Sequence, residues 1–164
     1  MESAGAKPAG ARLVARAWVD PAFRARLLED SAAAARELDI TTANATAPTV
    51  LKVVECTPDE HHMVVCTLCS CYPLSVLGLS PSWYKSRAYR ARAVREPRAL
   101  LSDSFGLVLP DHVRLRVHDS TADLRFLVLP LRPEGTNHLD EEELAHLVTR
   151  DTMIGVALCR TEQL

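Results

Sequence analysis

Three cysteines lie close together in the segment Cys66-Thr67-Leu68-Cys69-Ser70-Cys71, while the other two, Cys56 and Cys159, stand apart. In a reducing compartment, thiols clustered in this way indicate a bound metal or redox chemistry. Structural disulfides are instead typical of secreted chains. The segment is therefore the first candidate for chemistry in this sequence.

A structural zinc site is the simplest interpretation of such a cluster. Zinc in a structural site takes four tetrahedral ligands, usually from two Cys-x-x-Cys pairs in different parts of the chain. This sequence offers one such pair, and the spacing of Cys69 and Cys71 is cramped for a tetrahedron. A fourth ligand would have to come from outside the segment, and the candidates are Cys56, Cys159, His61 and His62.

The close pair Cys69 and Cys71 suits a planar chelate better. The sulfurs of both cysteines and the backbone nitrogens of Ser70 and Cys71 can lie in one plane if the two amides lose their protons. Cys66 can then reach an axial position, and the sixth position stays open for water or substrate, as a catalytic metal requires. Thiolates and deprotonated amides are strong-field donors, so this set favours Co(III) or Fe(III) over zinc.

The segment resembles the metal-binding motif of the nitrile hydratase alpha subunit. The similarity runs from about residue 10 to residue 158, and its motifs include Ala17-Trp18-Val19-Asp20-Pro21, Trp83-Tyr84-Lys85-Ser86, Val94-Arg95-Glu96-Pro97-Arg98 and Arg132-Pro133-Glu134-Gly135-Thr136. The resemblance implies an α+β fold with N-terminal helices and layers in the order α-β-β-α.

The resemblance also implies a role for each residue of the segment. Cys66 would be the axial ligand, and Cys69 and Cys71 the planar sulfur ligands, oxidised to sulfinic and sulfenic acid respectively. Ser70 and Cys71 would ligate through their backbone nitrogens. Thr67 is similar to the residue found in the cobalt-containing branch, so Co(III) is expected and Fe(III) is the alternative.

The reaction implied by the resemblance is the hydration of a small-molecule nitrile to an amide, with Cys69 and Cys71 as catalytic residues. The metal would act as a Lewis acid on the nitrile nitrogen. The attacking oxygen would come from metal-bound water or from the sulfenate of Cys71. In the family, a beta subunit supplies two arginines that hydrogen-bond the oxidised sulfurs, so a beta-type partner is expected.

Three features depart from the family pattern. Leu74, close to Tyr72 in the expected substrate pocket, stands where the family has tryptophan, and Ala47 stands where many members have glutamine. Loss of the large ring predicts a pocket opened for a bulky nitrile, with a nucleoside nitrile such as toyocamycin favoured, unless a partner side chain fills the space. Nine residues precede Gly10, where typical members carry a long helical arm. We therefore expect another chain to supply that contact or a weaker grip between the subunits.

Two alternatives to a nitrile hydratase remain open. The first is the metal-binding subunit of a thiocyanate hydrolase, which would use the same segment. The second is a non-enzymatic module that carries or stores a metal. Oxidised Cys69 and Cys71 would favour the enzymes, because a structural zinc site needs intact thiolates.

Other polar and aromatic groups have simpler structural interpretations. His61 and His62 are neighbours on an extended chain and point to opposite faces, which disfavours a shared ligand role. The run His118-Asp119-Ser120 is expected to be a strand end with a polar turn. We expect salt bridges and subunit contacts from the arginines of residues 87–98, core or interface packing from Trp83, Tyr84 and Tyr89, and burial of Cys56 and Cys159.

Composition places the chain among ordinary globular proteins. It has 164 residues, of which 48% are hydrophobic, and a formal net charge of −2. One domain is expected at this length, with a disordered segment 1–9 and a metal-binding catalytic domain 10–164. The charge argues against nucleic-acid binding. No apolar run approaches the ~20 residues that span a bilayer, and no signal peptide is apparent, so a cytoplasmic location is expected.

Several elements must position the segment. We predict helical structure over residues 11–38 with an N-cap at Asp20, a strand over 49–56, and a short strand from Met63 into the cysteines. Further helices are predicted from Ser80 to about residue 94, from Pro97 to about Gly106, and after Asp140. Strands are predicted around residues 113–117, over 124–129, and from about Met153 to Cys159.

Overall fold

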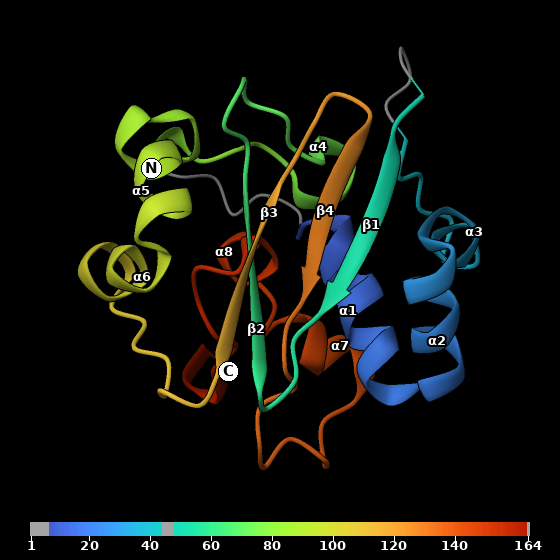
Figure 1. The fold of residues 1–164 in the computed structure, drawn as a ribbon. Helices are drawn as coiled ribbons and strands as arrows, with labels where there is room; N and C mark the ends of the chain where they lie inside the picture. Colours follow the sequence, from blue (N-terminus) through green and yellow to red (C-terminus); the bar gives the residue numbers. More distant parts are fainter. Residues whose placement is uncertain (1–6, 44–47, 164) are drawn as a thin grey trace, which may run out of the picture.

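The computed structural model describes residues 7–43 and 48–163. Its helices are α1 (Ala9–Val19), α2 (Pro21–Glu29), α3 (Ser31–Arg36), α4 (Leu74–Leu77), α5 (Arg87–Arg95), α6 (Pro97–Phe105), α7 (Glu141–Ala145) and α8 (Arg150–Ile154). Two 3₁₀ turns cover Ser82–Lys85 and Thr161–Gln163. The strands are β1 (Val50–Glu55), β2 (Glu60–Val65), β3 (Arg114–Asp119) and β4 (Leu124–Leu129), as Figure 1 shows.

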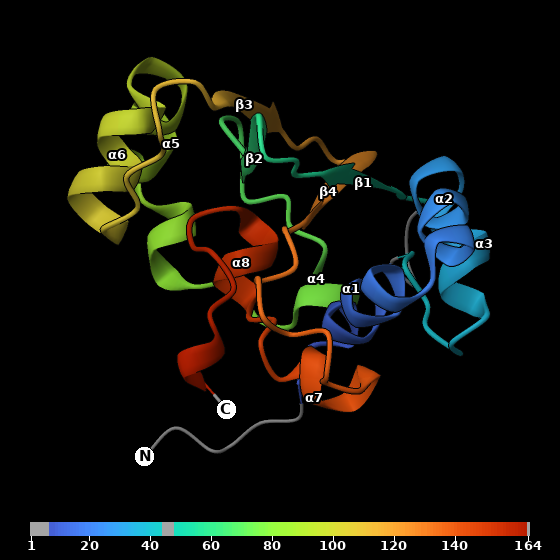
Figure 2. The ribbon, with the colours of Figure 1, turned by 90° about the horizontal axis from the view of Figure 1, so that it is seen from below.

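The strands form two parallel pairs. β1 pairs with β4, with Val50 opposite Leu124, and β2 pairs with β3, with Val65 opposite Asp119. Helices α2 and α3 pack against β1, and α6 packs against β3. Figure 2 shows these helices at the two ends of the row of strands, with α1, α4, α7 and α8 on one side of the row. The predicted α+β class and the order α-β-β-α are therefore confirmed.

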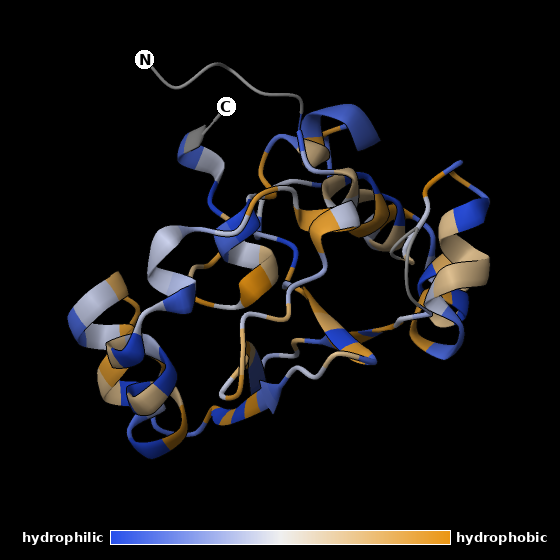
Figure 3. Cartoon of the chain, turned by 90° about the horizontal axis from the view of Figure 1, so that it is seen from above, coloured by the Kyte–Doolittle hydropathy of each residue, from blue (hydrophilic) through white to orange (hydrophobic). Residues whose placement is uncertain are grey.

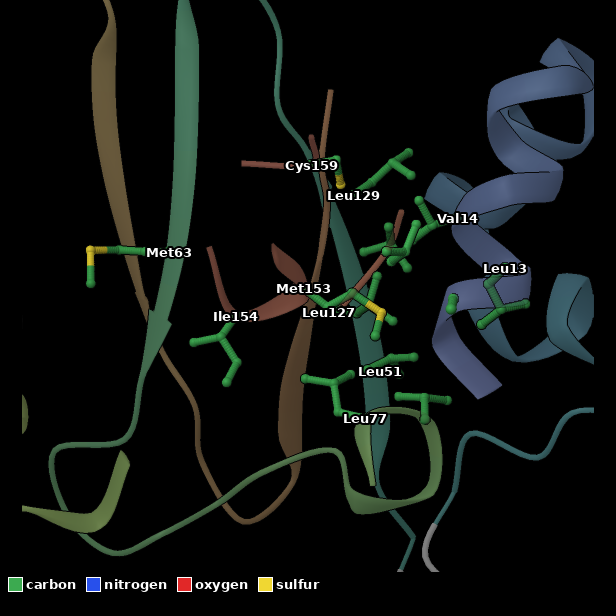
Figure 4. Close-up of a cluster of buried hydrophobic side chains, with 14 of the residues drawn as sticks. Leu13, Val14, Leu51, Met63, Leu77, Leu127, Leu129, Met153, Ile154 and Cys159 are labelled. Carbon is green, nitrogen blue, oxygen red and sulfur yellow. The ribbon is translucent and has the colours of Figure 1, made fainter. Parts of the chain in front are cut away.

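Successive side chains of β4 point to opposite faces of the strand, and those on one face contribute to the main hydrophobic core. Leu51, Leu127 and Met153 are buried and converge between β1, β4 and α1 (Figure 4). The intervening residues of β4, such as Val128, belong to a smaller apolar cluster on the opposite face. Hydrophilic and hydrophobic residues also alternate along β3 (Figure 3), as a half-buried strand requires.

Helix boundaries follow the predicted caps in most places. The Asp20 carboxylate accepts from the Phe23 N–H and begins α2, and Asp140 forms a capping box with Glu143. A second acidic cap, Asp30, separates α3 from α2 within the predicted helical region. The helix that starts at Pro97 ends at Gly106, whose φ of 64° is the left-handed conformation typical of a helix end.

Two predicted elements are wrong. A single helix opened by Ser80 does not form: a 3₁₀ turn comes first, and the Ser86 side chain caps α5 by accepting from the Tyr89 N–H. The predicted last strand is also absent from the described chain, because Met153 and Ile154 complete α8. Gly155 ends that helix with a φ of 94°.

The predicted domain limits remain a prediction. Residues 1–6 of the expected disordered segment lie outside the described residues, whereas Ala9 already belongs to α1. The helices within the described ranges are all too short or too polar to cross a membrane.

Candidate metal centre

The cysteine segment begins where β2 ends. Cys66 follows Val65 directly, and the register of β2 with β3 places Val65 opposite Asp119. The Asp119 carboxylate accepts two hydrogen bonds from Thr67, one from its N–H at 2.9 Å and one from its hydroxyl at 2.5 Å. The Ser120 N–H donates to the Val65 carbonyl at 2.7 Å. The first turn of the segment is thus fixed to the end of β3.

The three thiols of the segment converge. The Cys69 sulfur lies 3.3 Å from the Cys66 sulfur and 2.7 Å from the Cys71 sulfur, and all three lie within 4.8 Å of one another. Cys66 and Cys71 are buried and Cys69 is exposed. Within the described ranges, this is the one group of three or more His, Cys, Asp or Glu residues that could hold a metal ion.

The pKa values of two thiols in this cluster are shifted in opposite directions. Hydrogen bonds from the Cys71 and Cys66 thiols lower the pKa of Cys69, and the backbone N–H groups of Cys71 and Ser70 lower it further. Burial, followed by the hydrogen bond to Cys69, raises the pKa of Cys71 to about 12. The Cys69 thiol therefore ionises more readily than the Cys71 thiol.

The donor set fits a thiophilic metal ion. Three sulfurs converge, and the backbone nitrogens of Ser70 and Cys71 lie between the Cys69 and Cys71 sulfurs along the chain. The tetrahedral alternative lacks a fourth side chain, since none of the candidates outside the segment joins the cluster. His61 Nε2 instead lies 2.8 Å from the Gly155 carbonyl, and His62 Nδ1 lies 2.7 Å from His118 Nε2.

Contacts from α5 and the preceding turn hold the rest of the segment. The Tyr84 hydroxyl donates to the Cys71 carbonyl at 2.9 Å, and Arg90 Nη1 donates to the Cys69 carbonyl at 3.1 Å. The Tyr89 hydroxyl donates to the Val64 carbonyl at 2.5 Å. The expected burial of these tyrosines is confirmed. The hydrogen bond of Tyr84 to the segment and that of Tyr89 to β2 escaped prediction, because the only sequence signal was a set of polar aromatic residues at helical spacing.

One cavity adjoins the segment, and a second lies on the far side of Leu74. The first, of about 300 Å³, is lined by Cys69, Ser70, Cys71, Tyr72, Leu74, Ser80, Lys85 and Arg125. The second, of about 320 Å³, is lined by Thr41, Thr42, Ala43, Thr49, Pro73, Leu74, Ser75 and Arg125. The structure thus brings Tyr72 and Leu74 to the cysteines, whereas Ala47 lies outside the described residues.

The remaining candidates have structural contacts. Asp119 binds Thr67, and His118 stacks on His62, so the three-residue run that ends at Ser120 forms no hydrolytic triad. Cys56 and Cys159 are buried as expected, and burial raises their pKa to about 11 and about 12. Arg92 forms the expected salt bridges with Glu96 and Asp103.

The fold and the converging thiols define a class: an α+β domain with a cysteine-rich metal-binding loop beside a cavity. The family model of the nitrile hydratase alpha chain matches residues 1–157, and this chain belongs to that family of enzyme subunits. Nitrile hydratases are hydro-lyases, and the alpha subunits of the family work with a beta subunit.

The similar proteins include cobalt-containing and iron-type nitrile hydratases and a second enzyme, thiocyanate hydrolase. The low-molecular-weight cobalt-containing nitrile hydratase alpha subunit of Rhodococcus rhodochrous is 54% identical over 93% of this chain and 72% of its own. A structure of recombinant thiocyanate hydrolase with partially modified cobalt centres has a TM-score of 0.88 and 45% identity, over 94% of this chain and 75% of that chain. The structure of a double mutant of the iron-type nitrile hydratase from Comamonas testosteroni Ni1 has a TM-score of 0.87 and 44% identity, over 94% of this chain and 73% of that chain.

Proposed function

We propose that this chain is the metal-carrying alpha subunit of a cobalt nitrile hydratase and hydrates a nitrile to its amide with a beta-type partner. The observation that carries the proposal is the convergence of the Cys66, Cys69 and Cys71 sulfurs. Cys66, Cys69, Ser70 and Cys71 would hold the ion. The ion, when bound, supplies Lewis acidity toward the nitrile nitrogen.

The chain's own residues then position the substrate and the nucleophile. We propose that Cys69 and Cys71 act as sulfinic and sulfenic acids, the oxidation states that the resemblance implies. Both line the cavity of about 300 Å³, so a nitrile carbon placed there lies next to the sulfur oxygens. The oxygen of Cys71 or of a water molecule adds to that carbon. If water adds, that molecule supplies the amide oxygen, and its two protons end on the nitrogen. If the Cys71 oxygen adds, a second water molecule attacks the Cys71 sulfur, the bond between that sulfur and the transferred oxygen breaks, the sulfenate is restored, and the two protons of the water reach the nitrogen.

Cobalt is supported over iron by two observations. Thr67 is the residue that resembles the cobalt-containing branch, and the Rhodococcus rhodochrous relative named for cobalt shares 54% identity. The iron-type neighbour keeps Fe(III) as the alternative. Elemental analysis of the purified chain shows which of the two ions, cobalt or iron, is bound.

The substrate is proposed to be a bulky nitrile. Leu74 lines both cavities, and 56% of its surface is exposed, so it leaves space where a tryptophan ring would stand. Each cavity, at about 300 to 320 Å³, lies at the lower end of the volumes of sites that hold drug-sized ligands. A nucleoside nitrile such as toyocamycin is the first compound to test, and Tyr72 and Leu74 are its proposed contacts on this chain.

Thiocyanate hydrolysis is the second candidate, favoured by the thiocyanate hydrolase structure at a TM-score of 0.88. The test is turnover of toyocamycin and of thiocyanate by the chain purified with its partner subunits. Amide formation without thiocyanate loss supports the proposal. Thiocyanate turnover alone would replace it with the second candidate, and a stable metal without either turnover would indicate the metal-carrying module.

A cytoplasmic location is part of the proposal and is supported by the five free cysteines.

A further inference from the structure

Arg90 lies at the meeting point of α5 and the cysteine segment. Its Nη1 donates to the Cys69 carbonyl at 3.1 Å, and its side chain lines a groove shared with Thr67 and Arg87. The Cys69 carbonyl belongs to the same peptide unit as the Ser70 nitrogen. Arg90 therefore contacts the oxygen end of the peptide that joins Cys69 and Ser70, two residues of the proposed ligand set.

The charge of Arg90 has no carboxylate partner within the described part of the chain. Arg92, two residues further along the same helix, forms ion pairs with Glu96 and Asp103. Arg90 forms none there, and its Nε is buried without a hydrogen-bond partner. The guanidinium charge is thus directed at the segment rather than neutralised by an acid.

A peptide that ligates a metal through its deprotonated nitrogen carries a negative charge. Resonance spreads this charge over nitrogen and carbonyl oxygen. A guanidinium that hydrogen-bonds the oxygen stabilises the charge, because charge-assisted hydrogen bonds are roughly twice as strong as neutral ones. The amide proton leaves to solvent as the bond between nitrogen and metal forms, so the chain gains one negative charge beside Arg90.

We propose that Arg90 is a positioning residue of the metal centre, which fixes the Cys69–Ser70 peptide and offsets the charge of its ligating nitrogen. The inference rests on the proposed function, since it requires a metal in the cysteine segment. Tyr84 provides a contrast within the same segment: its hydroxyl binds the Cys71 carbonyl, whose peptide nitrogen belongs to Tyr72 and lies outside the proposed ligand set.

The test compares Arg90→Lys, Arg90→Gln and Arg90→Met in the full chain, produced with its partner subunits in cobalt-supplemented cells. The readouts are cobalt per chain after exposure to a chelator and the wavelength of the sulfur-to-cobalt absorption band. Loss of a group that orients metal ligands typically costs 10–100-fold in metal affinity. We expect the Met and Gln variants to lose cobalt roughly tenfold faster with a shifted band, and the Lys variant to recover most of both.

Arg87→Gln is the matched control, because Arg87 lines the same groove and no hydrogen bond joins it to the segment in the described structure. It should behave as wild type. Wild-type retention and absorption in Arg90→Met, or equal losses in Arg87→Gln, would overturn the inference. If the Met variant fails to fold, the comparison of Lys with Gln decides, since only Lys keeps the charge. A wild-type chain without cobalt would instead overturn the proposed function, and this inference with it.

Discussion

Among single residues, Leu74 is the one that we expect to determine which size of nitrile the site accepts. We expect Leu74→Trp to fill the space between the two cavities and to lower kcat/KM for a bulky nitrile at least tenfold, while a small nitrile such as acetonitrile is hydrated as before. One misplaced methylene in an apolar pocket is worth about 10–200-fold in discrimination, and an indole adds far more volume. Steady-state kinetics with both nitriles is the measurement, and an unchanged ratio would show that Leu74 does not set substrate size.

The residues of the site differ in how far they could be predicted from the sequence. The ligand segment was predictable because its donors are adjacent in the chain, so their spacing alone restricts the geometry. Asp119 and Arg90 escaped prediction as contacts of this segment, because each reaches it from another element. Asp119 was expected at a strand end with a polar turn, and Arg90 in a salt bridge or a subunit contact. A hydrogen bond from a side chain to a distant residue leaves no local pattern.

At the scale of elements, the turn after α8 depends on Gly155. Its φ is 94°, and a Cβ at this position would lie 2.7 Å from the Met63 Cα in β2. We expect Gly155→Ala to lower the free energy of unfolding by about 3 kcal/mol, through backbone strain and steric overlap. Gly135 is the control: its φ is 75°, but a Cβ there meets open space, so Gly135→Ala should cost about 1 kcal/mol. Equal losses in urea unfolding would refute the role of packing.

The pairing of β2 with β3 should also respond to pH. Burial, together with the nearby charges of His62, Arg116 and Lys52, lowers the pKa of His118 to about 4, and Glu60 opposes this. Burial lowers the pKa of His62 as well. Both values lie below that of an unfolded histidine, so the unfolded chain binds more protons and stability falls as the pH drops below about 6.5.

We expect this loss to be visible in urea unfolding between pH 7 and pH 5. His118→Gln should flatten the dependence, because one of the two histidines no longer titrates. The same substitution at the exposed His138 controls for the loss of an imidazole outside the pairing of β2 with β3. A slope that is identical in wild type and His118→Gln would contradict the account.

The elements themselves were partly predictable, for physical reasons that differ from place to place. The strands β1 and β4 followed from β-branched and apolar runs, and α2 and α7 from acidic caps. The strand predicted from Met153 failed because its apolar residues are buried as the end of a short helix, and apolar runs alone do not separate these two states. The helix predicted from Ser80 failed because Ser86 offers a better cap six residues later.

At the scale of the whole molecule, the fold places the cysteine segment at an open edge. Cys69 is exposed, and the neighbouring Leu68 has 88% of its surface exposed. Such an edge suits a family whose alpha subunits work with a beta subunit.

Whether the three converging cysteines hold a trivalent metal is tested most directly by elemental analysis of the purified chain for cobalt, iron and zinc, before and after exposure to a chelator. We predict about one cobalt per chain that resists removal, since an inert trivalent ion exchanges slowly, and loss of that cobalt in Cys66→Ala. A single zinc that the chelator removes, in a chain whose Cys69 and Cys71 are unoxidised by mass spectrometry, would contradict the account.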